Sequence, residues 1–194
     1  MRLEVLERGH RAPQRLLLGA LRLLRRGRPP PDIMRVVLYR PEVFGTPFRT
    51  WVQAVLRGPS PWSVGERELI AAVVSQANRC PFCAVTHGQV AARALADGPL
   101  VDLVVADWRH APVDERLRAA FSLAERLTQD PDGATAADVE PLWAAGLDDE
   151  AIAAVVHITA VFNVINRVAN AFAFRVPTAA EAAAGSARLL QRGY

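Results

Sequence analysis

The residues best suited to chemistry in this sequence are Cys80, Cys83 and His87. The two cysteines are the only ones in the chain and lie three positions apart. A pair so closely spaced cannot staple distant parts of a fold, so in a reducing compartment it indicates redox chemistry or metal binding. The thiolate is the form that attacks peroxides and disulfides. An imidazole one helical turn further along can relay protons to a thiol.

A helix beginning at the Cys80-Pro81 step is predicted to position these side chains. Proline favours the first helical position and pushes the preceding residue out of helical geometry, so Cys80 is the expected N-cap. Cys83 then falls in the first turn, where unpaired N–H groups and the helix dipole stabilise a thiolate. At about 100° per residue, Cys83 lies about 60° from Cys80 and His87 about 40° from Cys83. All three side chains therefore share one face.

The preceding helix brings an acid to the same place. Ser63 and Glu66 form a capping-box pattern, which predicts a helix that runs from there to about Asn78. Glu68 lies on this helix and returns alongside His87 if the two helices pack antiparallel. A carboxylate there would orient and polarise the imidazole, completing an arrangement of nucleophile, base and orienting group.

The rest of the chain also favours helices. Alanine and leucine dominate, no stretch alternates like a half-buried strand, and the length suits one compact domain. The last long helix is apolar, but Asn163, Asn166 and Asn170 favour a core helix over a membrane span. These amides either line a pocket or form an interhelical hydrogen-bond stripe. The other predicted helices cover residues 13–27, 32–39, 47–56, 114–128, 136–145 and 149–174.

The pattern Glu68, eleven residues, Cys80, two residues, Cys83, three residues, His87 resembles a known signature. It is similar to the Glu-x11-Cys-x2-Cys-x3-His motif of the alkylhydroperoxidase D-like proteins, whose superfamily includes the carboxymuconolactone decarboxylases. The segments 75–83 and 163–170 resemble its peroxidase-related branch. The resemblance spans about residues 30–175. We therefore expect a basic N-terminal helical arm over 1–30, an alkylhydroperoxidase D-like helical domain over 31–176, and a C-terminal tail over 177–194.

This resemblance implies an all-α fold, assembly into homo-oligomers such as trimers or hexamers, and reduction of hydroperoxides through a Cys80–Cys83 disulfide. It implies that Cys83 attacks the peroxide, that Cys80 resolves the intermediate, and that Glu68 and His87 relay protons. An unidentified thiol or protein would supply the electrons, and no metal, flavin or haem is implied. The helix argument alone favours Cys80 as the more activated thiol, so both orders stay open. Phe82 stands where the best-studied type has an additional histidine.

Two readings of the Cys pair compete with the peroxidase. The cysteines, His87 and Glu68 could bind a single zinc ion. Alternatively, the pair could serve a non-enzymatic redox or metal sensor that switches the arm or the oligomer.

Charge separates the N-terminal arm from the rest of the chain. Residues 1–40 carry a net charge of +7, while the remainder carries −4, which does not indicate a general nucleic-acid binder. The arm would pack on the body or another subunit, or contact an acidic partner or membrane surface. Its apolar run Leu16–Leu24 is too short for a membrane span and lacks a cleavage site, so a cytoplasmic protein is expected.

Overall fold

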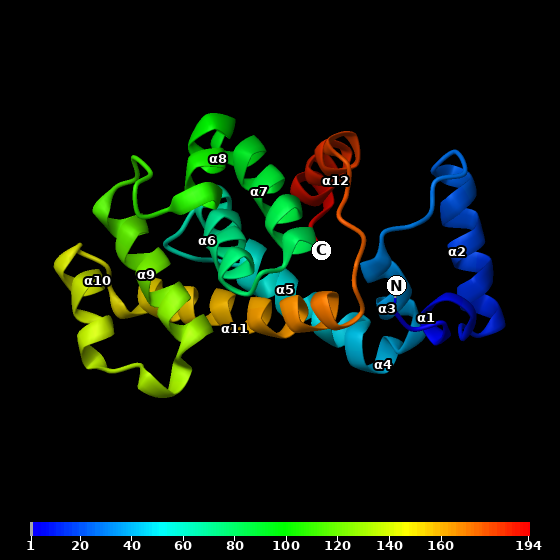
Figure 1. Cartoon of the computed structure of the whole chain (residues 1–194), viewed down its shortest axis with the longest axis horizontal. Coiled ribbons are helices and arrows are strands. Elements are labelled where there is room, and N and C mark those ends of the chain that lie inside the picture. The colour runs from blue at the N-terminus through cyan, green and yellow to red at the C-terminus, as the bar shows by residue number, and fades with distance from the viewer. Residues whose placement is uncertain (1) are drawn as a thin grey trace.

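The computed structural model describes residues 2–194, and over this range the chain is all-α, as predicted. Met1, the first residue of the predicted arm, lies outside the described residues. Figure 1 shows the arrangement of the helices. In chain order they are α1 (Val5–Arg8), α2 (Ala12–Leu24), α3 (Asp32–Tyr39), α4 (Pro41–Phe44), α5 (Thr46–Arg57), α6 (Val64–Ala77), α7 (Pro81–Leu95), α8 (Gly98–Asp107), α9 (Glu115–Gln129), α10 (Glu140–Ala144), α11 (Asp149–Ala171) and α12 (Ala179–Arg192), with short 3-10 turns at Pro131–Gly133 and Ala136–Asp138.

Helix α6 is the centre of the fold. It begins with the predicted capping box, in which the Glu66 amide donates to Ser63 Oγ at 3.2 Å and the Ser63 amide donates to Glu66 Oε2 at 2.7 Å. Its side chains are buried from Arg67 to Ser75 because α7, α9 and α11 pack around it. A helix covered on several sides has little freedom to shift, so it holds its polar side chains in fixed positions.

Helix α11 runs along the base of the molecule in Figure 1. It is long and apolar enough to cross a membrane by length and composition, yet 44% of its most apolar stretch is buried inside the fold. Val155, Ile158 and Val161 are completely buried, and the Trp62 indole donates to the Ala151 carbonyl at 2.9 Å. Helix α11 is therefore packed as a core helix, as the sequence predicted.

Besides the single-turn helices α1 and α4, two longer helices were not expected from the sequence. Residues 98–107 form α8, where Gly98-Pro99 predicted only a turn, because Asp97 caps the helix by accepting from the Leu100 amide at 3.0 Å. Residues 179–192 form α12 inside the predicted tail. A capping box of Thr178 and Glu181 starts it, and it packs along α7.

The predicted helix 136–145 is interrupted. A 3-10 turn precedes α10, and Pro141, which has no N–H to donate, lies in the first turn of α10.

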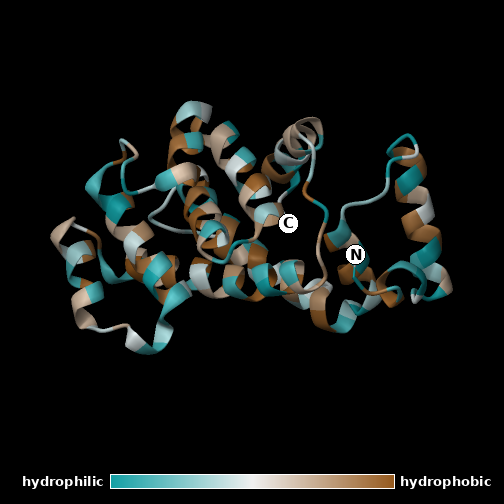
Figure 2. Cartoon of the chain, in the orientation of Figure 1, coloured by the Kyte–Doolittle hydropathy of each residue, from teal (hydrophilic) through white to brown (hydrophobic). Residues whose placement is uncertain are grey.

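The N-terminal arm has two different parts. Helix α2 has no buried residue, and Leu16, Leu23 and Leu24 are largely exposed. It stands apart from the body at the right of Figure 1, and in Figure 2 hydrophobic and hydrophilic residues alternate along its ribbon. In contrast, Leu6 of α1 is buried, and the Arg2 amide donates to the Phe172 carbonyl at 3.0 Å. The beginning of the chain therefore covers part of the body.

Candidate active site

Glu68 and His87 meet between α6 and α7, as the sequence predicted. The two helices pack along each other, and His87 Nδ1 lies 2.7 Å from Glu68 Oε2. Glu68 is fully buried and His87 nearly so. An ionised carboxylate only accepts hydrogen bonds, so the imidazole Nδ1 carries the proton and donates it. This leaves Nε2 as the ring nitrogen with a free lone pair.

His87 and a half-buried arginine together keep Glu68 charged. Arg57 at the end of α5 forms an ion pair with Glu68, with 2.6 Å between Nη2 and Oε1. Burial raises the pKa of the Glu68 carboxyl, but the charge and hydrogen bond of His87, together with Arg57, outweigh burial and lower it. The carboxylate is therefore ionised at neutral pH, the form that can stabilise an imidazolium.

Cys80 occupies the predicted N-cap of α7, with Pro81 as the first helical residue. Both sulfurs are buried, at 0% exposure for Cys80 and 1% for Cys83, and both cysteines are free thiols. A hydrogen bond from Cys83 lowers the pKa of Cys80 to about 7 against the opposing effect of burial, with help from the Cys83 and Phe82 amides. Cys80 therefore lies at the helix start that the sequence predicted, and its side chain makes no capping hydrogen bond there.

The pKa of Cys83 is shifted in the opposite direction from that of Cys80. The hydrogen bond of Cys83 to Cys80 raises this pKa well above the ordinary value, and burial adds to this effect. The two shifts therefore make Cys80 the more readily ionised of the two thiols. His87 lies four residues after Cys83, one helical turn along the same face.

The asparagines of α11 form an interhelical stripe that reaches the sulfurs. Asn166 is fully buried, donates to Ser75 Oγ at 3.1 Å and accepts from Asn78 Nδ2 at 3.2 Å. Asn78 also donates to Asn163 Oδ1 at 2.9 Å, and Asn170 donates to the Asn78 carbonyl at 3.0 Å. A hydrogen bond from Asn166 favours the ionised form of Cys80. The interhelical hydrogen-bond stripe is therefore present, and among residues 2–194 neither of the two main surface clefts is lined by these asparagines.

An apolar layer covers the cysteines. The buried members of this cluster are Leu6, Val36, Ala169 and Phe174. Phe82, which occupies the position of the additional histidine in the best-studied type, packs edge-on against Phe174 with 5.2 Å between ring centroids. Phe82 therefore belongs to the apolar cover of the thiols and supplies no proton-transfer group.

Tyr194 joins the site from the C-terminal segment, which the sequence analysis did not foresee. Its hydroxyl donates to Glu68 Oε1 at 2.8 Å and lies 3.1 Å from His87 Nδ1. The ring stacks on the imidazole at 5.9 Å, and the opposing contact of His87 is the edge of Phe162 at 4.5 Å. The sequence held one indication of this contact. In α5, Arg49, Gln53 and Arg57 recur every four residues and so form one polar face, which is the face that Tyr194 contacts.

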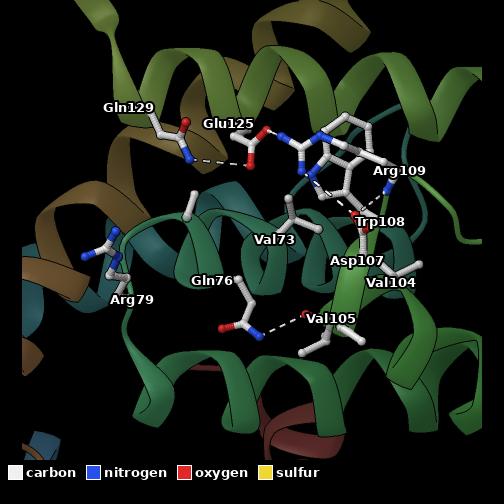
Figure 3. A pocket seen from close by; sticks show the side chains of 12 residues that line it. Val73, Gln76, Arg79, Val104, Val105, Asp107, Trp108, Arg109, Glu125 and Gln129 are labelled. Carbon is white, nitrogen blue, oxygen red and sulfur yellow. Dashed lines mark hydrogen bonds and ion pairs between the residues drawn. The ribbon is translucent and has the colours of Figure 1, made fainter.

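A separate surface cleft of 480 Å³ lies between α6, α8 and α9 (Figure 3). Polar side chains including Gln76, Arg79, Asp107 and Glu125 line it, and none of the predicted site residues does. The predicted site residues lie instead in the buried region at the start of α7 and between α6 and α7. Across residues 2–194, no group of three or more His, Cys, Asp and Glu side chains is arranged to hold a metal ion.

Comparison with known proteins places this geometry in context. The model of the carboxymuconolactone decarboxylase family matches residues 41–126. A peroxidase-related protein from Silicibacter sp. TM1040 is 29% identical over 89% of this chain and 88% of its own, with a TM-score of 0.74. A second, from Ralstonia eutropha JMP134 and described as an alkylhydroperoxidase AhpD core, is 26% identical over 92% of both chains, with a TM-score of 0.75.

A more distant solved structure shares the fold alone. It is the debrominase Bmp8 in complex with 2,3,4-tribromopyrrole, 16% identical over 95% of both chains, with a TM-score of 0.68. A comparison with curated proteins found no match. The family match, the two peroxidase-related structures and the all-α fold agree with the sequence motif, and together they support the similarity of this chain to the alkylhydroperoxidase D-like and carboxymuconolactone decarboxylase superfamily.

Proposed function

We propose that this protein is a thiol-dependent oxidoreductase that reduces hydroperoxides through a Cys80–Cys83 dithiol–disulfide cycle. The observation that carries the proposal is the buried Glu68–His87 pair, joined at 2.7 Å, in which His87 lies one helical turn after Cys83 on α7. A carboxylate, an imidazole and a thiol in this order match the roles of orienting group, base and nucleophile.

The cycle balances with two electrons. The Cys80 thiolate attacks the outer oxygen of a hydroperoxide, the O–O bond breaks, and the leaving alkoxide takes a proton to become an alcohol. Cys80 is then a sulfenic acid. The Cys83 thiol attacks this sulfur, a disulfide forms, and the hydroxyl leaves as water. An external dithiol of the cell or a reducing protein would return the disulfide to two thiols.

His87 would supply and collect the protons. In its protonated form it can give the Nε2 proton to the leaving alkoxide, and it can then take the Cys83 proton when that thiol attacks. The negative charge of Glu68 stabilises the imidazolium formed in between. Between residues 2 and 194, His87 is hydrogen-bonded to Glu68 and Tyr194 and to neither sulfur, so a water molecule or the substrate itself would bridge the remaining gap.

The order of attack proposed here follows the helix start. Cys80 has the lowered pKa and the N-cap position, which favours it as the attacking sulfur. The family resemblance implies the reverse order. Replacing each cysteine in turn by serine distinguishes the two orders of attack, because only the attacking thiol forms a sulfenic acid when its partner is absent.

The apolar cover favours an organic oxidant over a small polar one. The sulfurs are shielded by Leu6, Val36 and Phe174, so a substrate reaches them after this layer shifts. An alkyl or aryl hydroperoxide can replace the lost apolar contacts with its own carbon groups, whereas hydrogen peroxide cannot.

The test is a stopped-flow reaction of the fully reduced protein with cumene hydroperoxide, with the remaining thiols counted over time. We expect both thiols to disappear together and much faster than free cysteine. If neither thiol reacts faster than free cysteine, the peroxidase proposal is wrong. Zinc bound in equimolar amount after purification without chelator, with slow oxidation, would instead favour the sensor.

A further inference from the structure

We propose that Tyr194 is a positioning residue of the thiol site, whose hydroxyl fixes the Glu68 carboxylate and the His87 imidazole for proton exchange. This inference rests on the proposed function and assigns a role to a residue outside the Glu–Cys–Cys–His motif. Its geometric basis is that one hydroxyl lies within hydrogen-bond distance of both members of the pair, 2.8 Å from Glu68 Oε1 and 3.1 Å from His87 Nδ1.

The end of the chain is built to deliver this hydroxyl. Helix α12 is anchored on α7, where Arg93 Nε donates to Ser186 Oγ at 3.3 Å. After Arg192 the backbone turns at Gly193, which has a φ of +70°. A β-carbon at that position would come within 2.2 Å of Gln53 Oε1. Glycine therefore allows the turn that directs Tyr194 inward.

Helix α5 then holds Tyr194 at three points along one face. Gln53 Oε1 accepts from the Tyr194 amide at 2.8 Å, and Arg49 Nη2 donates to the Tyr194 carbonyl at 3.2 Å. The Arg57 guanidinium lies 5.0 Å from the centre of the phenol ring, within the range of a cation–π contact. Contacts to the backbone and to the ring are both present, so the position of the hydroxyl is determined from several directions.

The consequence for the chemistry lies in the hydrogen bonds of Glu68. Oε2 of this carboxylate accepts from His87, and Oε1 accepts from Tyr194 and pairs with Arg57. With all three partners in place the carboxylate cannot rotate, and the imidazole, stacked on Tyr194, keeps Nδ1 directed at it. Only Nε2 is then left to exchange protons with thiol or substrate. Loss of the hydroxyl removes one of these restraints without removing the charges.

Tyr194→Phe separates this role from simple space filling. Phenylalanine keeps the ring, its stacking on His87 and the contact with Arg57, and lacks only the hydroxyl. We expect oxidation by cumene hydroperoxide to slow about ten-fold, the effect of losing one hydrogen bond to a charged group. The matched control is Tyr39→Phe, which removes the hydroxyl of the other tyrosine of the chain, on α3, and should oxidise like the wild type. Equal rates for Tyr194→Phe and wild type would overturn the inference.

A spectroscopic titration tests the placement without any turnover. The chain has two tyrosines, so in Tyr39→Phe the ultraviolet phenolate signal comes from Tyr194 alone. The charged groups that face this phenol are Arg57 from α5, Glu68 from α6 and His87 from α7. Burial and the Glu68 charge both raise the pKa of Tyr194 well above the ordinary value. Adding Glu68→Gln should therefore move phenolate formation to lower pH.

The oxidation assay and the titration distinguish failure of the proposed function from failure of the inference about Tyr194. A wild-type protein whose thiols ignore the peroxide contradicts the proposed function, and the titration then decides the inference alone. Delayed ionisation that shifts with Glu68→Gln supports the placement on the carboxylate. Ionisation of the folded protein near pH ~10, the ordinary phenol range, with no response to Glu68→Gln, overturns it.

Discussion

Replacing Glu68 by glutamine is the sharpest perturbation of this site, because the new side chain has the same shape and no charge. All the partners of Glu68 are donors: His87 Nδ1, the Tyr194 hydroxyl and Arg57. A glutamine amide offers one acceptor oxygen, so its NH2 group must face one of these donors. If it faces His87, the ring relieves the clash by moving its proton from Nδ1 to Nε2, and the lone pair needed for proton exchange is lost.

Both rate and stability follow from this geometry. Loss of a correctly oriented general base costs about 10²- to 10⁴-fold in rate, so thiol oxidation should slow by that factor. One hydrogen bond to a charged group is lost, which lowers the free energy of unfolding by about 2 kcal/mol. For a chain of this size the midpoint of thermal unfolding should fall by about 4–8 °C. The protein should still fold, because the glutamine oxygen remains as an acceptor for one of the surrounding donors.

The assay is stopped-flow thiol consumption with cumene hydroperoxide, paired with nitrogen NMR of the imidazole to identify its protonated nitrogen. Glu66→Gln is the matched control on the same helix. Its side chain serves the capping box, in which glutamine substitutes for glutamate, so its rate should equal that of the wild type. A Glu68→Gln protein that is folded, has its proton on Nδ1 and oxidises at the wild-type rate would refute the reasoning.

Three further predictions concern the sulfurs and their surroundings. In the reduced wild-type protein, brief alkylation followed by peptide mapping should label Cys80 before Cys83, this labelling should rise through a pH of about 7, and preferential labelling of Cys83 would contradict the assignment. Asn166→Ala should raise the pH at which Cys80 ionises, because a donor to the thiolate is lost; an unchanged titration would exclude this role. Phe174→Ala should speed alkylation of both thiols by iodoacetamide by opening their apolar cover, and equal rates would show that access lies elsewhere.

The sequence predicted the core of the site because its determinants are local. A proline after Cys80 and a capping box at Ser63 each define a helix start within a few residues, and helical spacing then places Cys83 and His87 on one face. Placing Glu68 beside His87 required one further assumption, that the two neighbouring helices pack antiparallel. A short connection between helices favours this arrangement.

The missed parts depend on contacts between distant segments. Tyr194 reaches Glu68 across 126 positions in the chain, and no local pattern announces where a terminal segment docks. Helix α12 is rich in alanine, so its apolar face is weak in the sequence even though Ala182 and Ser186 are buried. Arg57 appears in the sequence as one more arginine among many, and its contact with a buried carboxylate emerges only when α5 packs beside α6.

The most direct test of the central claim is a mass measurement on the peptide that spans residues 80–93. Trypsin cuts after Arg79 and Arg93, so this peptide carries both cysteines of the chain and His87. After the reduced protein reacts with an equimolar amount of cumene hydroperoxide, we expect the peptide to have lost two hydrogen atoms, with an equal amount of cumyl alcohol formed. A peptide that keeps both hydrogens while the hydroperoxide stays intact would contradict the dithiol–disulfide cycle.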